Sequence, residues 1–477
     1  MMDIYIPLVI ILSLFILVIL IRTFKFKPKS YPEMKKRFNI DEKRILESLS
    51  MKIKIPTVSY IDNHKINQKA FSDFKKHLKE RYPLINQHAT YKEIKTGVLY
   101  HIKGKSNEEP TVLMAHFDVV PAKGKWSFDP FCGTIDEKYV YGRGTLDTKN
   151  SLNAIMEAVE FSLKNKKVFK NDLYIAFSGE EEIYGSTQKE MVDYFIKNDI
   201  KPYMVFDEGG AIVSNMFPGV SEKVAVVGIA EKGMMNLKLT TYTKGGHAST
   251  PPKNTALTTL AKAVVRLNQS KQFKLKLTSP VKILFDTLAP HSKNFMIRLI
   301  FANLWLFTPI VKLIAKLSGG ELLSMFKTTQ AFTLAQASHA INVLPNQATI
   351  GINYRLRPNE SSKDVIKRVK KIIKNDDIKI EVLSVSESTT TSKTDEAFAI
   401  VRQAIKKTWP DIIVSPYLMV ATSDSRHYHK ICERVYKFSP MYVTKEDLKL
   451  IHGDDEKITI ENALDGTHFY LNLIEKL

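Results

Sequence analysis

Residues 111–118 read TVLMAHFD, an apolar run that ends at once in a histidine and an aspartate. Two later runs repeat this arrangement: residues 173–182 read LYIAFSGEEE, and residues 204–210 read MVFDEGG. Short apolar runs of this kind are typical of buried strands, and the amphipathic segment 151–163 between them is typical of a helix. From about residue 40 onward we therefore predict an α/β fold.

The polar residues that follow these strands predict one shared site, because the ligand crevice of an open α/β sheet lies beyond the carboxyl ends of its strands. His116 and Asp118 share one side of an extended chain, so that the carboxylate can orient the imidazole. Asp147 lies in a glycine-flanked turn (residues 141–149, YGRGTLDTK), and His452 lies in IHGDDE (residues 451–456). Each motif is weak alone. Together they supply enough oxygen and nitrogen ligands for two divalent ions.

The composition narrows the class of protein. The chain has 477 residues, of which 44% are hydrophobic and 25% charged, which excludes a disordered, collagen-like or multi-span membrane protein. Only two cysteines occur, so any metal site must use His, Asp and Glu. The net charge of +20 comes from scattered lysines interleaved with acidic residues, without a nucleic-acid-binding motif. We expect no nucleic-acid partner, and favour a basic surface that faces anionic lipid or small anions.

The N-terminal stretch from Ile4 to Ile21 is apolar and long enough to span a bilayer. A signal peptide is the alternative, but Asp3 precedes the stretch, no Lys or Arg does, and no A-x-A-like cleavage site follows. We predict an uncleaved single-pass anchor (residues 4–21). Seven Lys and Arg residues within 22–37 follow it, so the positive-inside tendency places the body of the protein on the cytoplasmic side.

From about residue 45 to its end the chain resembles the co-catalytic zinc amidohydrolases of metallopeptidase family twenty. It looks most similar to the branch that contains carboxypeptidase S and the N-fatty-acyl-amino-acid synthase/hydrolases. The blocks that carry the resemblance are TTQA (328–331), INVLP (341–345), NYRLRP (353–358) and TSDSRH (422–427). The resemblance implies a catalytic domain with a mixed sheet and flanking helices, and two divalent metal ions, with zinc as the expected metal.

The resemblance also implies a role for each candidate residue. Asp147 would bridge the two metals, Asp118 would orient a ligand histidine, and Glu181 would be the general base. The remaining metal ligands form one pair for each ion: His116 and Asp207, Glu182 and His452. The first of the three glutamates is Glu180, where the family usually has an aspartate. The assignment of base and ligand within the three glutamates could therefore be shifted by one residue.

The segment 229–385 reads as a separate unit with the order β-α-β-β-α-β, which suggests a ferredoxin-like insert. It would divide the catalytic domain into residues 40–228 and 386–477. In the resembled family this insert is a lid that forms homodimers. His247, within GGHA (residues 245–248), resembles the lid histidine that reaches a neighbouring subunit's site and polarises the scissile carbonyl.

Arg355, Asn342 and Arg426 are the candidates for holding the free carboxylate of a substrate, because a guanidinium can bind a carboxylate through two hydrogen bonds. We expect a metal-dependent amidohydrolase or carboxypeptidase that acts on N-acyl amino acids or small peptides. A dipeptidase, a biosynthetic deacylase such as a desuccinylase, and an inactive membrane-bound binding protein of the same fold are the alternatives.

One apolar and aromatic segment, residues 295–317, departs from the smaller members of the resembled family. Arg298, Pro309, Lys312 and Lys316 interrupt it. Each charge would cost about 2.5–3.5 kcal/mol in the bilayer centre, so a second span is disfavoured. A buried pair of lid helices and an interfacial or acyl-chain-binding surface both remain open.

Overall fold

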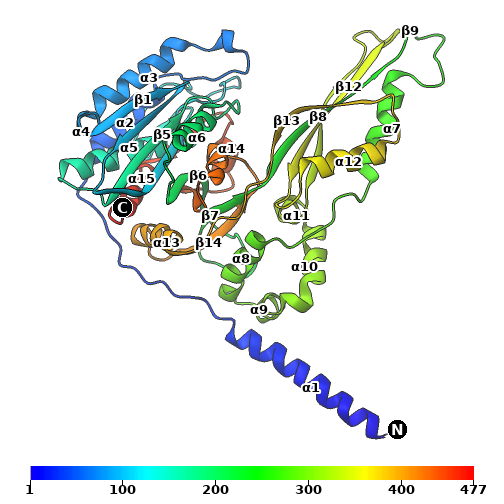
Figure 1. Cartoon of the computed structure of the whole chain (residues 1–477), viewed down its shortest axis with the longest axis horizontal. Helices are drawn as coiled ribbons and strands as arrows, with labels where there is room; N and C mark the ends of the chain where they lie inside the picture. Colours follow the sequence, from blue (N-terminus) through cyan, green and yellow to red (C-terminus); the bar gives the residue numbers. More distant parts are fainter. Residues whose placement is uncertain (1) are drawn as a thin grey trace.

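The computed structural model describes residues 2–477 and contains two main sheets, with an N-terminal helix that extends away from them (Figure 1). The larger sheet is mixed and has eight strands in the order β1-β2-β5-β3-β6-β15-β7-β14. Its strands are β1 (Ala89–Ile94), β2 (Gly97–Ile102), β3 (Ser106–His116), β5 (Asn171–Ser178), β6 (Met204–Val213), β7 (Val224–Glu231), β14 (Ile413–Met419) and β15 (Val435–Tyr442). The predicted α/β class and mixed sheet are confirmed.

The parallel strands β5, β3 and β6 form the middle of this sheet, and all three arise from the apolar runs that predicted them. Helices pack on both faces. They are α2 (Glu42–Ile53), α3 (Gln68–Arg81), α4 (Pro83–His88), α5 (Lys149–Lys164), α6 (Thr187–Lys197), α13 (Glu396–Thr408) and α15 (Ile460–Ile474). Shorter elements complete the domain: η1 (Asn63–Lys65), β4 (Tyr139–Tyr141), η3 (Asp424–Lys430), α14 (Asp447–Leu450) and β16 (Lys457–Thr459).

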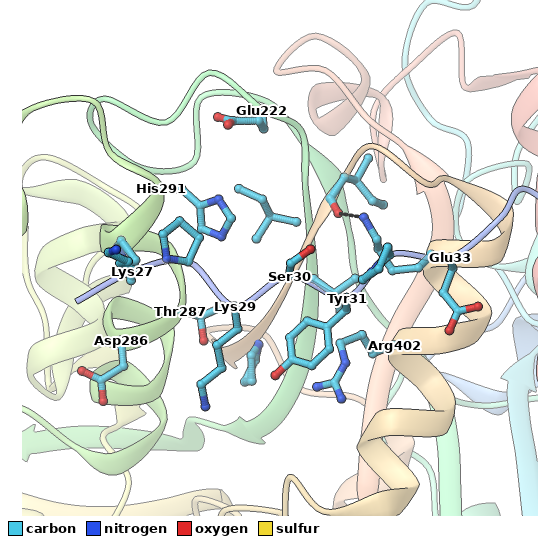
Figure 2. A pocket seen from close by; sticks show the side chains of 18 of the residues that line it. Lys27, Lys29, Ser30, Tyr31, Glu33, Glu222, Asp286, Thr287, His291 and Arg402 are labelled. Atoms are coloured by element: carbon cyan, nitrogen blue, oxygen red, sulfur yellow. Dashed lines mark hydrogen bonds between the residues drawn. The ribbon is translucent and has the colours of Figure 1, made fainter. Parts of the chain in front are cut away.

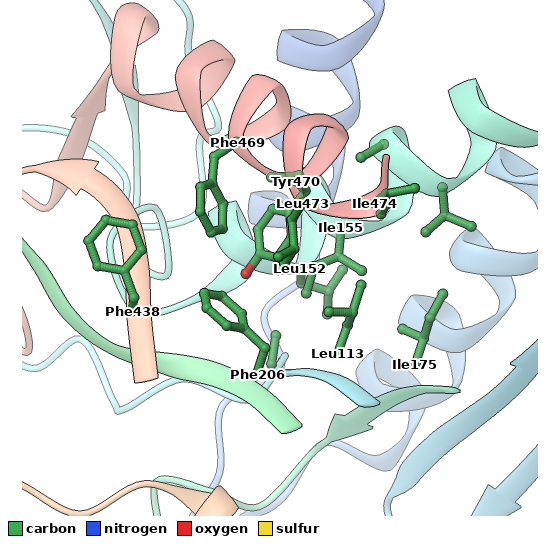
Figure 3. Close-up of a cluster of buried hydrophobic side chains, with 14 of the residues drawn as sticks. Leu113, Leu152, Ile155, Ile175, Phe206, Phe438, Phe469, Tyr470, Leu473 and Ile474 are labelled. Atoms are coloured by element: carbon green, nitrogen blue, oxygen red, sulfur yellow. The ribbon is translucent and has the colours of Figure 1, made fainter. Parts of the chain in front are cut away.

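The main core lies between the central strands and the helices α5 and α15, as Figure 3 shows. Leu113 of β3 and Phe206 of β6 face Leu152 of α5 and Phe469 of α15. Alternate residues of the same strands, such as Met114, face α6 on the other side of the sheet. Because both faces are covered, the strands are apolar along their whole length and become polar only at their ends.

The second sheet has four antiparallel strands in the order β10-β12-β8-β13. It comprises β8 (Gly233–Tyr242), β10 (Thr329–Gln336), β12 (Gln347–Leu356) and β13 (Lys379–Ser386), with α7 (Ala256–Gln269) and α12 (Ser362–Ile373) on one face. This is the strand order of a ferredoxin-like unit. A short ribbon of β9 (Gly246–His247) and β11 (Val343–Leu344) extends the sheet at its far tip (Figure 1).

A helical segment lies between α7 and β10, within the range predicted for the lid. It consists of α8 (Ser279–Leu288), η2 (Ala289–His291), α9 (Phe295–Ala302), α10 (Leu304–Ser318) and α11 (Gly320–Phe326). Its core residues, among them Phe285 and Phe326, pack with Val226 of β7 and Tyr417 of β14. This segment therefore packs on the edge of the large sheet and outside the core of the lid sheet.

The N-terminal helix α1 (Met2–Lys25) is long and apolar enough over Ile6–Lys25 to cross a membrane, and a signal sequence can have the same properties. An extended linker then runs along the body of the protein. The guanidinium carbon of Arg402 lies 3.8 Å from the centre of the Tyr31 ring. Glu33 accepts a hydrogen bond of 2.8 Å from the side chain of Gln403. Lys36 forms an ion pair with Glu475. These contacts fasten the linker to α13 and α15.

The linker also lines a cavity of about 920 Å³ between α8 and α13 (Figure 2). Lys29 and Tyr31 of the linker lie between Asp286 and His291 on one side and Arg402 on the other. This cavity shares no lining residue with the ligand cluster described below.

Candidate active site and metal centre

Two groups of potential metal ligands share Asp147. One group is His116, Asp147 and Glu208, and the other is Asp147, Glu182 and His452. Within each group, the potential ligand atoms lie within 4.8 Å of one another. His116 Nε2 lies 3.1 Å from Asp147 Oδ1, and His452 Nε2 lies 3.0 Å from Asp147 Oδ2. The two oxygens of Asp147 thus face different histidines, which is the arrangement that a bridging carboxylate requires.

The structure places Glu208, and not the predicted Asp207, beside His116. Glu208 Oε1 lies 3.2 Å from His116 Nε2, whereas Asp207 Oδ2 accepts a hydrogen bond of 3.0 Å from the Ser425 backbone N–H. Both carboxylates belong to β6, in which successive side chains point to opposite faces. The prediction treated the strand as ending at Phe206, and this left the choice between the two neighbours unconstrained.

Asp118 connects the histidine to the glutamate run. His116 Nδ1 donates to the backbone oxygen of Asp118 at 2.9 Å, while the nearest carboxylate oxygen of Asp118 lies 3.4 Å away. The Asp118 carboxylate accepts the backbone N–H groups of Glu181 and Glu182, each at 3.1 Å, and the Ser59 hydroxyl at 2.8 Å. Asp118 therefore contacts His116 mainly through its backbone, and its side chain holds the turn that carries the two glutamates.

The three glutamates have different surroundings. Glu180 accepts hydrogen bonds from the backbone and the hydroxyl of Thr187, at 2.6 and 2.8 Å, and lies 3.2 Å from Lys95. Glu182 Oε2 lies 3.0 Å from His452 Nε2. Glu180 is thus engaged by Thr187 and Lys95, and Glu182 is the glutamate of the run that joins the ligand cluster.

The electrostatics of the pocket suit bound cations. Burial, together with the nearby Asp147, raises the pKa of Glu208 to about 8. Burial also raises the pKa of Glu181 well above its ordinary value. Hydrogen bonds to Asp147 and Glu182 raise the pKa of His452 to about 10. Among residues 2–477, the buried Oε1 of Glu182 has no hydrogen-bond partner. A site with more carboxylates than histidines and a buried unpaired oxygen fits two divalent cations.

Sequence analysis missed a buried ion pair that holds the loop before Asp147. Arg143 Nη1 lies 2.6 Å from Glu456 Oε2, and both side chains are almost completely buried. Glu456 Oε1 also accepts the backbone N–H groups of Gly144 and Leu146, at 3.1 and 2.8 Å. One carboxylate thus fixes the turn that positions Asp147. Glu456 ends the motif IHGDDE, and nothing in that motif distinguishes a buried glutamate from a solvated one.

The candidates for substrate binding fall into two places. Arg355 lies near the end of β12 that adjoins Gly233, and its buried Nη1 has no hydrogen-bond partner among residues 2–477. Arg426 is already engaged, because its Nη1 donates to the Ser423 backbone oxygen at 2.7 Å and lies 3.6 Å from Asp424.

His247 and Asn342 lie together at the opposite end of the lid. His247 pairs with Val343 across the β9–β11 ribbon, and the Asn342 backbone oxygen accepts the Ala248 N–H at 3.0 Å. Both side chains are exposed. Arg355 is the ninth residue of β12, so it lies about 26 Å along the strand from Gln347, the end of β12 nearest this tip, at 3.3 Å per residue. The structure therefore does not bring His247 and Asn342 to the ligand cluster of the same chain (Figure 1).

The fold and the ligand cluster define a hydrolase of the metallopeptidase class. The family model described as peptidase family M20/M25/M40 matches residues 112–476, and the chain belongs to this family.

Two relatives cover most of the chain. The probable carboxypeptidase S-like 2 of Dictyostelium discoideum is 35% identical over 431 residues, which are 88% of this chain and 82% of the relative. The N-fatty-acyl-amino acid synthase/hydrolase PM20D1 of Xenopus tropicalis is 33% identical over 478 residues, which are 96% of this chain and 93% of the relative. The resemblance noted from the sequence motifs is confirmed.

Solved structures share the fold. The M20 family metallo-carboxypeptidase Sso-CP2 from Sulfolobus solfataricus has a TM-score of 0.69 at 18% identity, covering 92% of this chain and 100% of its own. The YXEP protein of Bacillus subtilis, described as a dinuclear metal binding peptidase, has a TM-score of 0.55 at 12% identity, with 92% of this chain and 99% of its own covered.

Proposed function

We propose that this protein is a membrane-anchored, two-metal amidohydrolase that cleaves the amide bond of N-acyl amino acids or small peptides with a free carboxylate. The observation that carries the proposal is the convergence of two ligand groups on the shared carboxylate of Asp147, with Glu181 adjacent in sequence to the ligand Glu182. The inactive binding protein is disfavoured, because every ligand position and the candidate base are filled by suitable side chains.

His116, Asp147 and Glu208 would hold one cation, and Asp147, Glu182 and His452 the other. Their nitrogen and oxygen donors suit zinc. When bound, two such cations would lower the pKa of a shared water and polarise the scissile carbonyl.

Glu181 is the proposed proton carrier. Asp118 fixes the backbone of Glu181 through a hydrogen bond of 3.1 Å, so that the carboxylate is held beside the ligand cluster. A carboxylate in this position could accept a proton from water and then donate it to the leaving nitrogen.

Arg355 is the proposed anchor for the free carboxylate of the substrate. A buried guanidinium nitrogen without a partner among residues 2–477 is costly, and a bound carboxylate would satisfy it through a charge-assisted hydrogen bond. Arg426, which is already paired, is a weaker candidate for this role.

His247 and Asn342 would act on the site of a second copy of the chain. Both are exposed at the lid tip, beyond the start of β12 and so at least about 26 Å along the lid from Arg355, and an intermolecular role therefore suits them better than an intramolecular one. This proposal implies a homodimer in which each lid completes the neighbouring site.

The substrate class rests on the relatives, one of which is named as an N-fatty-acyl-amino acid synthase/hydrolase and another as a carboxypeptidase S-like protein. An acylated amino acid or a short peptide presents the amide and the carboxylate that this site could bind.

A panel of N-acyl amino acids and dipeptides, assayed with the full chain in detergent or vesicles, tests the proposal. We expect release of an amino acid that stops when a chelator removes the metal and returns on addition of Zn²⁺. Turnover of dipeptides alone would favour the dipeptidase alternative, and turnover of an N-succinylated diamino acid alone would favour the desuccinylase. Purified protein without bound metal and without turnover would contradict the proposal.

A further inference from the structure

The helices α9 and α10 lie against the C-terminal half of α1. Phe295 at the start of α9 packs on Phe24, with ring centroids 6.1 Å apart, and Trp305 at the start of α10 packs edge-on against Phe15 at 5.7 Å. Phe24 and Phe15 are separated by about 13 Å along α1, at 1.5 Å per residue. The segment from Phe295 to Trp305 therefore contacts α1 over the part of its apolar stretch that lies between Phe15 and Phe24, and this stretch is long enough to cross a membrane.

The side-chain amide nitrogen of Asn303, at the junction of α9 and α10, donates hydrogen bonds to α1. Asn303 is completely buried, and its Nδ2 donates to the Thr23 hydroxyl at 3.2 Å and to the Ile19 backbone oxygen at 3.3 Å. Thr23 is itself only 3% exposed. Removal of α1 as a signal peptide would uncover these groups, so the contact supports an α1 helix that stays attached to the body.

The remaining surface of the two helices is apolar and unpartnered. Trp305 is 56% exposed, Leu313 54% and Leu317 78%. Met296, Ile310 and Ile314 are also exposed. Large apolar side chains gathered on one element are unusual for a surface in water and mark an interaction site.

The charged residues of the segment lie away from the junction of α9 and α10, in the first turn of α9 and in the second half of α10. Arg298 is in the first turn of α9 and donates to the Ser292 backbone oxygen at 2.6 Å. Lys312 and Lys316 follow Leu304 by about 12 and 18 Å along α10, at 1.5 Å per residue. Side chains at such positions can extend their amines toward lipid head groups.

We propose that α9 and α10 form a re-entrant wedge that inserts into one leaflet of a lipid bilayer beside α1. The two helices are bent by 117° at Asn303, which returns the chain to the side from which it entered. With α1 perpendicular to a hydrocarbon core of about 30 Å, Trp305 reaches close to its middle. A bilayer is the occupant that fits, because Trp305, at the start of this exposed apolar face, packs against Phe15 in the middle of α1. The inference rests on the proposed membrane insertion of α1.

Lipid quenching of tryptophan fluorescence tests the wedge. The full chain is reconstituted into vesicles of phosphatidylcholine and phosphatidylglycerol, with or without brominated phosphatidylcholine. The chain has three tryptophans, of which Trp126 and Trp409 belong to the catalytic body. We expect brominated lipid to quench the native protein, Trp305→Phe to lose most of the quenchable emission, and Trp409→Phe to retain it.

Two matched positions sharpen the test in the Trp305→Phe background. Leu313 and Leu257 are similarly exposed, at 54% and 51%, but Leu257 lies on α7, far from α1 (Figure 1). We expect Leu313→Trp to restore quenching and Leu257→Trp not to restore it.

The outcomes separate the wedge from the α1 anchor and from the proposed amidohydrolase activity. Protein that floats with the vesicles while Trp305→Phe leaves the quenchable emission unchanged overturns the wedge and leaves the α1 anchor. Protein that does not float with the vesicles overturns both. The readout does not use turnover, so loss of the amidohydrolase proposal would not affect it.

Discussion

The glutamate run offers the sharpest test at the scale of single residues. Glu181→Gln keeps the shape of the side chain but cannot accept a proton, so we expect turnover to fall by about 10²–10⁴-fold with the metal content unchanged. Glu180→Gln is the matched control, because its amide oxygen can still accept the Thr187 hydrogen bonds. Metal analysis and steady-state kinetics check both. Loss of activity in Glu180→Gln alone would show that the register is off by one.

The neighbouring carboxylates of β6 allow a second comparison. Because Glu208 faces His116 and Asp207 faces Ser425, we expect Glu208→Gln to lower the bound metal from about two toward one per chain. Asp207→Asn should retain most of the metal. The metal content of both variants is measured by mass spectrometry after gel filtration. Loss of metal from Asp207→Asn but not from Glu208→Gln would identify Asp207 as the ligand.

At the scale of secondary-structure elements, the ion pair between Arg143 and Glu456 links the turn before Asp147 to β16. Breaking a buried pair leaves an uncompensated charge, so we expect Glu456→Gln to lower the free energy of unfolding by about 3–5 kcal/mol. The exposed pair of Lys76 and Glu80 is the control, and Glu80→Gln should change little. Denaturant unfolding measures both variants. If Glu456→Gln were as stable as the native chain, the ion pair between Arg143 and Glu456 would not support the loop.

Lys52 joins α2 to α5 and makes stability depend on pH. Burial lowers the pKa of Lys52 from its ordinary value of 10.5 to about 7 in the folded protein. Between these values the unfolded chain holds a proton that the folded chain has released, so raising the pH favours the folded state. We expect the stability of the native chain relative to Lys52→Met to increase from pH 7 to 10.5. A difference that stays constant across this range would contradict the assignment.

The order of the lid elements and the strands that end at the site could be predicted from the sequence, because apolar periodicity reports which side chains a sheet buries. The choice between Asp207 and Glu208 could not, because both lie inside β6 and the sequence does not show which of the two side chains points to the face that carries His116. The packing of α9 on α1 and the burial of Glu456 also escaped prediction. Both result from contacts between segments hundreds of residues apart, which local patterns do not record.

At the scale of the whole molecule, the exposed lid tip predicts that two copies cooperate. His247→Ala and Glu181→Gln should each be nearly inactive alone. In a mixed dimer, the chain that carries His247→Ala retains its own Glu181 and receives His247 from its partner, so one site is complete. We therefore expect mixing the two variants to restore turnover, measured after co-reconstitution. Absence of any recovery would indicate that each chain uses its own lid or no lid histidine.

The anchor predicts that the full chain stays with membranes after alkaline carbonate extraction, because Ile6–Lys25 is long and apolar enough to span. The basic residues that follow the helix favour a cytoplasmic catalytic body. Protease added to intact cells or spheroplasts should spare the body. Digestion from outside would reverse the orientation and leave the anchor in place.

The linker that Tyr31, Glu33 and Lys36 fasten to the body has a consequence for pairing. With α1 inserted in a bilayer, as proposed, a body tied closely to it could not tumble freely and would diffuse in a plane with one face toward the lipid. Much of the rotational and translational entropy that association costs is then lost before two copies meet. Lids of modest intrinsic affinity can pair at such an effective concentration, whereas the same chains dispersed in dilute detergent would separate.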